Sequence, residues 1–519
     1  MHSFHKKQFL PHIYSTKHFF IKRWIFLLIL IPYIVWSFLT YKDFGITVDE
    51  PIEYGFGEML YNRNFGRDPL LLKDFAYEGK DSREIWAYNH FHTMLLYIFN
   101  DTGSIENYHL LNLLFFSLSL YVAYELVFQF SRNSKLSLLG PIILLLTPRL
   151  IGDIPANVKD PVFSTYYLFG LLAIVLAPKI KNNFIRLIFL GVSFGLAASM
   201  RILGYGLLFV YLVLKLIDIF HKRDDAPLKK ILNLGFELTI IFSFSLLVHA
   251  IQMPFVASNP TMHLLRLMEV SKDYPWRGPM LYLGQVVQAG QLPWHYPLVW
   301  SAVITPLFIL FFGLIGIFRF SSNKVGRILA LSLLVNYALY YLIKPNIYDG
   351  VRHLLFTLAI MSVLAAITWT DFWIKRKKLR KWLLLSFVIN VFLVGHQFLK
   401  LHPYEYIYFN EFVSYLPGAY NKFETDYWGA SYLEASKWLL EKRGNRGGVV
   451  ALCGKTHAGR YFNGSKFRIV LLPNCDISEK DDLNYIFSYG KNNEWTRFKE
   501  KEIYSVSRQG VPLVKIFEL

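Results

Sequence analysis

Eleven apolar stretches alternate with polar segments along the first 400 residues of the chain. An α-helix needs about 20 apolar residues to cross the hydrocarbon core of a bilayer, and each stretch with a modest flank meets that length. The stretches are centred near residues 32, 119, 143, 169, 194, 211, 242, 308, 335, 361 and 391. The pattern predicts a polytopic membrane protein of mainly α class, and 54% hydrophobic and 17% aromatic residues agree with that class.

Lysine and arginine gather on alternate segments between the apolar stretches. They lie before the first stretch and after the second, fourth, sixth, eighth and tenth. Cytoplasmic loops of membrane proteins carry an excess of Lys and Arg, so these segments are predicted to face the cytoplasm. The N-terminus is then cytoplasmic, and the chain after about residue 400 is external. The formal charge of +18 comes largely from these segments, so it indicates topology and not nucleic-acid binding.

Four long segments are predicted on the external side, at residues 41–108, 147–161, 252–297 and 344–353. The first holds two amphipathic pieces, residues 52–62 and 85–99, which suit helices lying in the membrane interface. The third is rich in Pro and Trp, as interfacial anchors are. Such helices could cover a cavity at the external face.

The composition after residue 400 changes to that of a soluble domain, so we expect a membrane domain, residues 1–400, and a small external α/β domain, residues 401–519. A helix is predicted at residues 431–441 and strands at 449–452, 467–472, 485–487 and 511–517. Both cysteines, Cys453 and Cys475, fall in this part. An external compartment permits a disulfide between them. Two buried free thiols are the alternative, because the sequence does not give the distance between the Cα atoms.

A dense acidic cluster opens the first external segment. Asp49 and Glu50 follow the first apolar stretch, between the helix breakers Gly45 and Pro51. A carboxylate there can act as a general base toward an acceptor hydroxyl. Asp160, near the end of the second external segment, is the other acidic candidate. Asp49, Glu50 and Asp160 are therefore the candidate catalytic residues, and for Glu50 a solvated position or a helix cap is the alternative.

Cations on the external side point to an anionic ligand. Lys344, Arg352 and His353 lie in the last external segment, and Arg201 lies near the end of the fifth apolar stretch. An arginine at membrane depth is costly unless it is paired or hydrated. Charge-assisted hydrogen bonds from such groups hold phosphates well. The four residues are candidate ligands of a phosphate. Contact with lipid headgroups is the alternative for the loop, and snorkelling toward water is the alternative for Arg201.

Four strings of residues resemble those of a known family. They are residues 157–161 (NVKDP), 348–353 (YDGVRH), 402–410 (HPYEYIYFN) and 423–432 (FETDYWGASY). With the external Asp49-Glu50 pair, they are similar to the GT-C membrane glycosyltransferases. More narrowly, they resemble bacterial relatives of the protein O-mannosyltransferases and of the lipid A aminoarabinose transferase. The resemblance covers residues 24 to about 440.

The resemblance implies a GT-C type bundle and a function. The expected reaction is inverting transfer of a sugar from a polyprenyl-phosphate donor to a hydroxyl of a lipid such as lipid A, a glycan or a protein, outside the bacterial cytoplasmic membrane. Asp49 matches the family's base-like aspartate, and Asp160 matches a second acid that helps to hold a metal, so a divalent ion on Asp49 and Asp160 is a candidate cofactor. Arg201, Lys344, Arg352 and His353 match positions near the donor phosphate, while His90 and His92 (where relatives often have His-Pro-Pro, without the Pro here) and Lys159 are candidate substrate contacts.

Two other classes of function compete with this one. A transporter or flippase of a lipid-linked sugar predicts broken helices at matching positions of two repeated halves, and the sequence has no such halves. A scaffold whose soluble tail recruits partners leaves the external acids and cations unexplained. The sequence therefore favours a glycosyltransferase whose partners are a polyprenyl-phosphate sugar, membrane lipids and an external acceptor.

Overall fold

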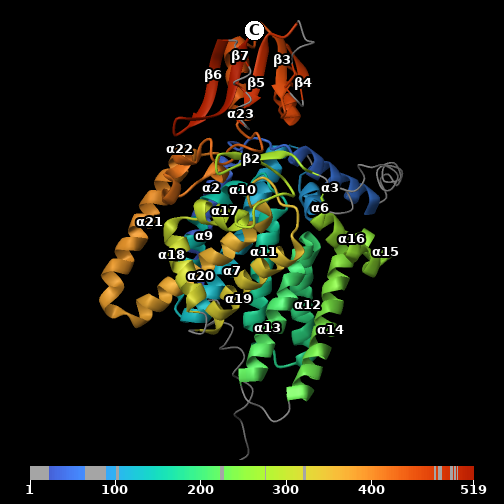
Figure 1. The fold of residues 1–519 in the computed structure, drawn as a ribbon, viewed down its shortest axis with the longest axis vertical. Helices are drawn as coiled ribbons and strands as arrows, with labels where there is room; N and C mark the ends of the chain where they lie inside the picture. The colour runs from blue at the N-terminus through green and yellow to red at the C-terminus, as the bar shows by residue number, and fades with distance from the viewer. Residues whose placement is uncertain are drawn as a thin grey trace, which may run out of the picture.

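The structure is a computed structural model, and it describes residues 23–64, 89–100, 104–221, 227–274, 276–319, 323–472, 475–476, 482–490, 495, 498 and 501–519. Helices form an elongated bundle, and a small β-sheet domain lies beyond one end of it (Figure 1). Residues 1–22 and 222–226, whose basic side chains were used to predict orientation, lie outside the described residues.

Eight of the described helical spans are long and apolar enough to cross a membrane. Three shorter apolar spans, Trp24–Thr40, Ser134–Leu145 and Leu307–Phe318, complete the set. Every predicted centre falls inside one of these eleven, so the prediction of a polytopic helical bundle is confirmed. The long helices are α7 (Ile105–Ser131), α11 (Asp160–Leu176), α12 (Asn183–Met200), α13 (Gly206–His221), α14 (Pro227–Gln252), α19 (Lys324–Ile343), α20 (Leu355–Lys375) and α21 (Arg380–Leu401).

The structure shows how the three short spans are built. The first contains α2 (Leu27–Thr40), and α8 (Ser134–Ser137) and α9 (Leu139–Leu145) make the second. The third is α18 (Leu307–Phe318), which is separated from α17 (Tyr296–Ile304) by Thr305 and Pro306. Proline lacks an amide hydrogen and collides with the preceding turn. The apolar run around residue 308 is therefore two helices.

Helix α20 lies at the centre of the bundle. It is apolar on all sides apart from small hydroxyls and, in its last two turns, Asp371 and Lys375, as suits a helix buried among others. In the most apolar 18-residue stretch of each span, 89% of the residues are buried for the span that contains α20, against 17% for α14 and 22% for the span that contains α21. The hydroxyl of Ser362 on α20 forms a 2.8 Å hydrogen bond with that of Thr147. Because α20 is fixed on all sides, the residues just before it are fixed too.

Short elements gather at the end of the bundle nearest the sheet domain (Figure 1). The helix predicted at 52–62 is confirmed as α3 (Glu50–Asn64), and its position in the membrane interface stays a prediction. The one at 85–99 corresponds to α6 (Phe91–Ile98), with residues 85–88 outside the described part. The sequence did not predict the hairpin of β1 and β2. The other elements here are α10 (Pro148–Asp153), α15 (Pro254–Ser258), α16 (Pro260–Lys272), β1 (Pro279–Tyr282) and β2 (Gln285–Gln288).

A connecting segment, residues 402–431, runs across the ends of the helices before the sheet domain begins. It contains η6 (Glu405–Ile407), η7 (Glu411–Val413) and α22 (Tyr415–Ala419). The side-chain amide of Asn410 donates to the carbonyls of Ala302 and Thr305, both at 2.6 Å. These bonds use carbonyls freed where α17 ends. The connecting segment is thus tied to the bundle.

The sheet domain has five strands in the order β4-β3-β5-β7-β6 (Figure 1). Strand β3 pairs in parallel with β4 and β5, while β7 is antiparallel to β5 and β6. The predicted helix and four strands are confirmed, and β6 was not predicted. The elements are α23 (Tyr432–Arg443), β3 (Gly448–Cys453), η8 (Thr456–Phe462), β4 (Phe467–Leu472), β5 (Tyr485–Tyr489), β6 (Lys501–Arg508) and β7 (Val511–Glu518).

Both cysteines are buried free thiols in this domain. They belong to one apolar cluster with Leu472 and Ile486. Of the two alternatives that the sequence left open, the structure therefore has the pair of free thiols and not the disulfide.

Candidate active site

Asp49 sits at the start of α3, on a loop that other parts of the chain hold closely. The amide of Val48 donates to the carbonyl of Trp428 at 3.3 Å. A Cβ atom on Gly45 would collide with the carbonyl oxygen of Ala430. Glycine is the residue that permits such a close approach of two backbones. The Asp49 loop, residues 44–49, is thereby fixed against the connecting segment, while the Asp49 side chain stays 45% exposed.

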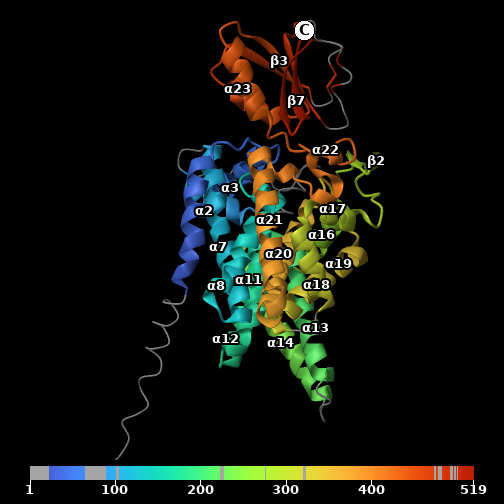
Figure 2. The same ribbon diagram turned by 90° about the vertical axis from the view of Figure 1, so that its left-hand side faces the viewer.

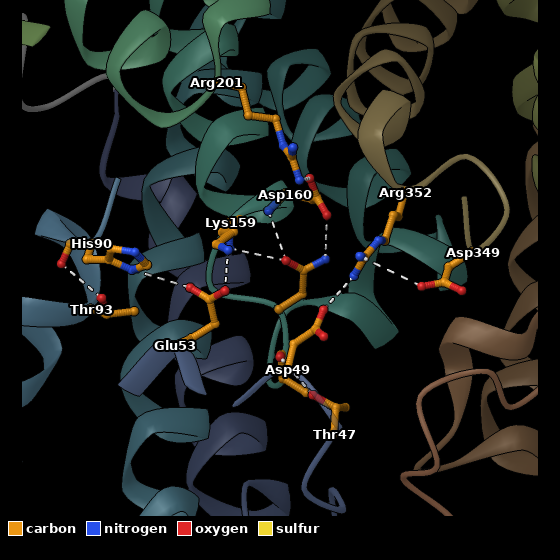
Figure 3. A network of polar contacts seen from close by, with 12 residues as sticks. Thr47, Asp49, Glu53, His90, Thr93, Lys159, Asp160, Arg201, Asp349 and Arg352 are labelled. Atoms are coloured by element: carbon orange, nitrogen blue, oxygen red, sulfur yellow. Dashed lines mark hydrogen bonds and ion pairs between the residues drawn. The ribbon is translucent and has the colours of Figure 1, made fainter. Parts of the chain in front are cut away.

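Arg352 comes from the segment at residues 344–353, the last of those predicted to be external, and contacts Asp49 directly. Its Nη1 atom lies 2.7 Å from Oδ2 of Asp49, and its Nη2 atom lies 3.7 Å from Asp349 (Figure 3). The guanidinium lies over the rings of Tyr348 and Trp428, at 4.7 and 5.7 Å from their centroids. Arg352 is buried and immediately precedes the central helix α20. Its charge is therefore held in one place by ion pairs and by cation–π contacts.

Asp160 is the first residue of α11 and is held by a capping side chain. Oδ1 of Asn157 accepts from the amide of Asp160 at 2.9 Å, and Nδ2 of Asn157 donates to the Asp160 carboxylate at 2.9 Å. The carboxylate also forms an ion pair with Arg201 (Figure 3). A negative charge is favoured at a helix N-terminus. Arg201, which the sequence placed at membrane depth, thus has a partner.

Glu53 forms a third ion pair, with Lys159, and lies 3.5 Å from Nδ1 of His90 (Figure 3). Glu53 follows Asp49 by four residues, so both side chains leave the same face of α3. Burial opposes ionisation of Glu53, but the charges of Lys159 and His90 outweigh it and lower the pKa of Glu53 to about 2. Glu53 is a permanent anion and a poor proton acceptor at neutral pH.

The three ion pairs surround one cavity of about 70 Å³. Its walls also include the rings of Phe56, Tyr274, Tyr348 and Trp428. Three carboxylates face three cations, so the cavity is balanced in charge. The charged residues that line it are Asp49, Glu53, Lys159, Asp160, Arg201 and Arg352.

Several buried polar atoms at this cavity have no hydrogen-bond partner within the described part of the chain. They are Nε1 of Trp428, Nε of Arg352, Nε of Arg201 and Nδ1 of His353. Three of the four are obligate donors, and His353 can be one. Buried donors are nearly always paired in native proteins. This group is therefore poised for a ligand rich in acceptor oxygens.

Three predicted site residues lie away from the cavity lining as the described residues define it. Glu50 is fully buried and accepts from Nε2 of His109 at 2.7 Å and from the amide of Thr47 at 2.6 Å. His92 faces α7, where its Nε2 atom lies 3.3 Å from Asn112. Lys344 is exposed at the end of α19. Glu50 and His92 thus join α3 and α6 to α7.

The structure brings together the other predicted residues. Asp49, Lys159, Asp160, Arg201, Arg352 and His353 line the cavity, and His90 stands behind Glu53. Sequence reasoning missed Glu53, Tyr348 and Trp428 as site residues. The spacing of Glu53 from Asp49 and the strings at 348–353 and 423–432 were usable signals for them.

Asp153 is a buried acid beside the site. It ends α10, is fully buried, and neither of its carboxylate oxygens has a hydrogen-bond partner among the described residues. Burial raises the pKa of Asp153 to about 7, although the positive charge of Arg149 opposes the rise. An uncharged carboxyl near neutrality follows from this placement.

The candidate metal ligands do not fit a divalent ion. Asp49 pairs with Arg352, and Asp160 pairs with Arg201. Within the ranges that the structure describes, no group of three His, Cys, Asp or Glu side chains converges as a metal site requires. The position that a cation would take beside each carboxylate holds a guanidinium. We therefore route no chemistry through a metal.

Three solved structures give the following similarities. ArnT from Cupriavidus metallidurans matches in the apo state, with a TM-score of 0.48 and 10% identity over 97% of this chain and 98% of that one. The same protein bound to undecaprenyl phosphate matches with a TM-score of 0.46 and 11% identity over 94% and 98%. The Archaeoglobus fulgidus oligosaccharyltransferase in complex with Zn and sulfate matches with a TM-score of 0.39 and 11% identity. The match covers 78% of this chain and 59% of the oligosaccharyltransferase, so this chain spans about three fifths of that protein.

All three are glycosyltransferases of the GT-C fold, the group that the sequence strings resemble. The scores are low, and the similarity extends to the arrangement of the fold only. No protein-family model matches the chain. No curated protein matches it either.

Proposed function

We propose that this protein transfers a sugar from a polyprenyl-phosphate donor to an acceptor hydroxyl, on the external face of a cytoplasmic membrane. One observation carries the proposal: a charge-balanced cavity at the end of a membrane bundle, where unpartnered buried donors surround an accessible carboxylate. A sugar phosphodiester supplies acceptor oxygens and one negative charge. The acceptor oxygens match the unpartnered donors of the cavity walls, and Arg201 and Arg352 are cations near which the negative charge can lie.

Asp49 is the proposed general base. Of the three carboxylates at the cavity its side chain is the most exposed, at 45%, against 11% for Glu53 and 3% for Asp160. An acceptor hydroxyl can therefore reach Asp49 without displacing a buried ion pair. Asp49 takes the hydroxyl proton while the oxygen attacks the anomeric carbon. Glu53 is unsuited to this step because its pKa is lowered to about 2 by Lys159 and His90, against the effect of burial.

Donor groups that line the same cavity hold the leaving phosphate. As the new bond forms, the bond from the anomeric carbon to the phosphate oxygen breaks, and its electron pair stays on the phosphate. Nε of Arg352, Nε of Arg201 and Nε1 of Trp428 are available to donate to that oxygen or its neighbours. Fixed donors aimed at developing charge lower the barrier without reorganising. Attack opposite the leaving group gives inversion at the anomeric carbon.

Arg352 serves both steps in this scheme. Nη1 orients the Asp49 carboxylate, while Nε is free of any partner among the described residues. The guanidinium presents five N–H donors in a rigid fork. It can bridge the base and the phosphate at the same time. This bridge sets the spacing between the acceptor oxygen and the leaving group.

The proposal is tested with the full chain reconstituted in liposomes. Polyprenyl phosphate carrying a radiolabelled sugar is added with an envelope fraction that supplies lipid, glycan and protein acceptors. We expect label on an acceptor and release of one polyprenyl phosphate for each sugar transferred. Label that stays on the polyprenyl lipid would overturn the proposal. Movement of the intact labelled lipid across the bilayer would favour the flippase instead.

A further inference from the structure

We propose that the sheet domain is a positioning element of the active site, acting through the hydroxyl of Tyr461 on the loop that carries Asp49. This inference rests on the proposed function for its catalytic consequence. The contact itself stands on geometry alone. Oη of Tyr461 accepts a hydrogen bond of 2.6 Å from the amide of Ile46, across 415 residues of sequence.

The Asp49 loop is enclosed by two parts of the chain that follow the membrane helices. On one side the connecting segment contributes the carbonyl of Trp428, which accepts from Val48, and Ala430, which packs on Gly45. On the other side η8 of the sheet domain supplies Tyr461. The side chain of Ile46 is itself buried. A loop gripped on both sides has few conformations in which to carry Asp49.

The sheet domain is attached to the connecting segment and to α21 at two separate places, and this attachment fixes the position of η8. Lys455, just before η8, donates to the carbonyl of Tyr427, next to the cavity residue Trp428. At the far side of the sheet, Nε of Arg508 donates to the carbonyl of His402 at 3.1 Å. Gln509 donates to Gln397 on α21 at 2.6 Å. Two-point attachment prevents the domain from rocking about a single contact.

The Tyr461 hydroxyl is the hydrogen-bonding contact that the sheet domain makes with this loop. The amide of Ile46 lies three residues before Asp49, and a buried amide without an acceptor is strongly disfavoured. Removing the hydroxyl leaves the loop free to shift until the amide finds another acceptor. A shift of about 1 Å in a catalytic group costs up to about 100-fold in rate. Donor binding depends on Arg352, Arg201 and Trp428 and does not pass through this bond.

The test is Tyr461→Phe in the full chain, which keeps the ring and removes the oxygen. The matched control is Tyr504→Phe on β6, whose ring stacks on Trp438 with centroids 4.4 Å apart. Two quantities are measured: hydrogen exchange of the peptide that contains Ile46, and kcat against the affinity for polyprenyl phosphate. For Tyr461→Phe we expect faster exchange and a kcat lower by up to about 100-fold, with affinity unchanged. For Tyr504→Phe we expect neither change.

Exchange and turnover decide the matter separately. Unchanged exchange at Ile46 in Tyr461→Phe overturns the inference whatever reaction the protein performs. Faster exchange with wild-type kcat also overturns it, because the loop would then move without affecting Asp49. Loss of donor affinity in step with kcat would mean a general disturbance of the cavity and would overturn the positioning role. Failure of the wild-type chain to transfer any sugar counts against the proposed function alone.

Discussion

Nη1 of Arg352 and Oδ2 of Asp49 lie 2.7 Å apart although 303 residues separate them in sequence. One residue opens the first external segment, and the other closes the last. The contact therefore joins two segments that lie far apart in the chain, one that follows α2 and one that precedes α20. It also places Asp49, the proposed base, beside Arg352, the proposed phosphate ligand. One ion pair therefore contains both functional groups.

Arg352→Ala should weaken binding of the polyprenyl-phosphate donor by about 10- to 150-fold. A hydrogen bond to a charged group contributes about 1.5–3 kcal/mol, which corresponds to that range. Arg352→Lys should recover only part of the affinity, because an ammonium cannot bridge Asp49 and the phosphate as a planar fork does. Binding is measured with labelled polyprenyl phosphate in detergent micelles.

Lys344→Ala is the control for the effect of Arg352→Ala on donor affinity. Lys344 carries the same charge in the same external segment but is exposed at the end of α19. Its removal should leave donor affinity unchanged. A loss from Lys344→Ala that matches the loss from Arg352→Ala would move the phosphate out of the cavity.

Glu53→Gln should lower stability at neutral pH, and the deficit should vanish in acid. Burial opposes ionisation, but Lys159 and His90 bring the pKa of Glu53 from its ordinary 4.5 to about 2. The stabilisation is complete above about pH 4.5 and is lost as pH falls through about 2. Each pKa unit corresponds to about 1.4 kcal/mol, so the deficit at pH 7 is on the order of 3 kcal/mol.

Thermal unfolding of the detergent-solubilised protein, followed by tryptophan fluorescence from pH 7 down to pH 3, measures this deficit. Glu58→Gln is the control, since Glu58 lies on the same helix but is exposed. If the Tm difference between wild type and Glu53→Gln is the same at both ends of the range, the ion pair with Lys159 has no stabilising role.

The stability of Asp153→Asn relative to wild type should change with pH in the opposite sense to that of Glu53→Gln. Burial raises the pKa of Asp153 from 3.8 to about 7, against the effect of Arg149. Between these values the folded chain keeps a proton that the unfolded chain has released, so wild-type stability falls as pH rises from about 4 to 7. Asparagine does not ionise. The Tm of Asp153→Asn relative to wild type should therefore rise over that interval and stay level above it, and a flat difference would contradict the assignment.

Hydropathy predicted the bundle because a run of about 20 apolar residues is a local signal. The run around residue 308 gave one helix where the structure has α17 and α18, although Pro306 marks the break. Strand β6, with the sequence KEIYSVSR at the edge of the sheet, was missed because it buries little and alternates weakly. Edge strands have partners on one side only, so their apolar pattern is diluted.

The sequence located the site through its rare charges and could not supply their pairing. Asp49, Asp160 and Arg352 stand out as charges in the predicted external segments, and Arg201 stands out because an arginine at membrane depth needs a function or a partner. Glu50 and Glu53 look alike in the sequence, but successive helical residues are rotated by about 100°. Glu53 thus faces the cavity with Asp49, while Glu50 faces His109. The pairing of Glu53 with Lys159, across 106 residues, exists only in the folded chain.

Orientation is a prediction from the basic segments. A reporter active only outside the cytoplasm should work when fused after Leu519 and fail when fused within residues 375–381. The Asp49 loop and the sheet domain lie at the same end of the bundle (Figure 2), so one result assigns the side for both. Activity in the basic segment and silence at the C-terminus would put the cavity in the cytoplasm and contradict the proposed donor chemistry.

The central claim is that Asp49 is the general base, and Asp49→Asn tests it most directly. The substitution keeps the shape of the side chain and removes its charge. General-base catalysis contributes about 10²–10⁴-fold, so the single-turnover rate of sugar transfer should fall by that factor. Affinity for the anionic donor should be retained, because the lost carboxylate competes with phosphate for Arg352. A single-turnover rate near that of the wild type, with the donor still bound, would contradict the account.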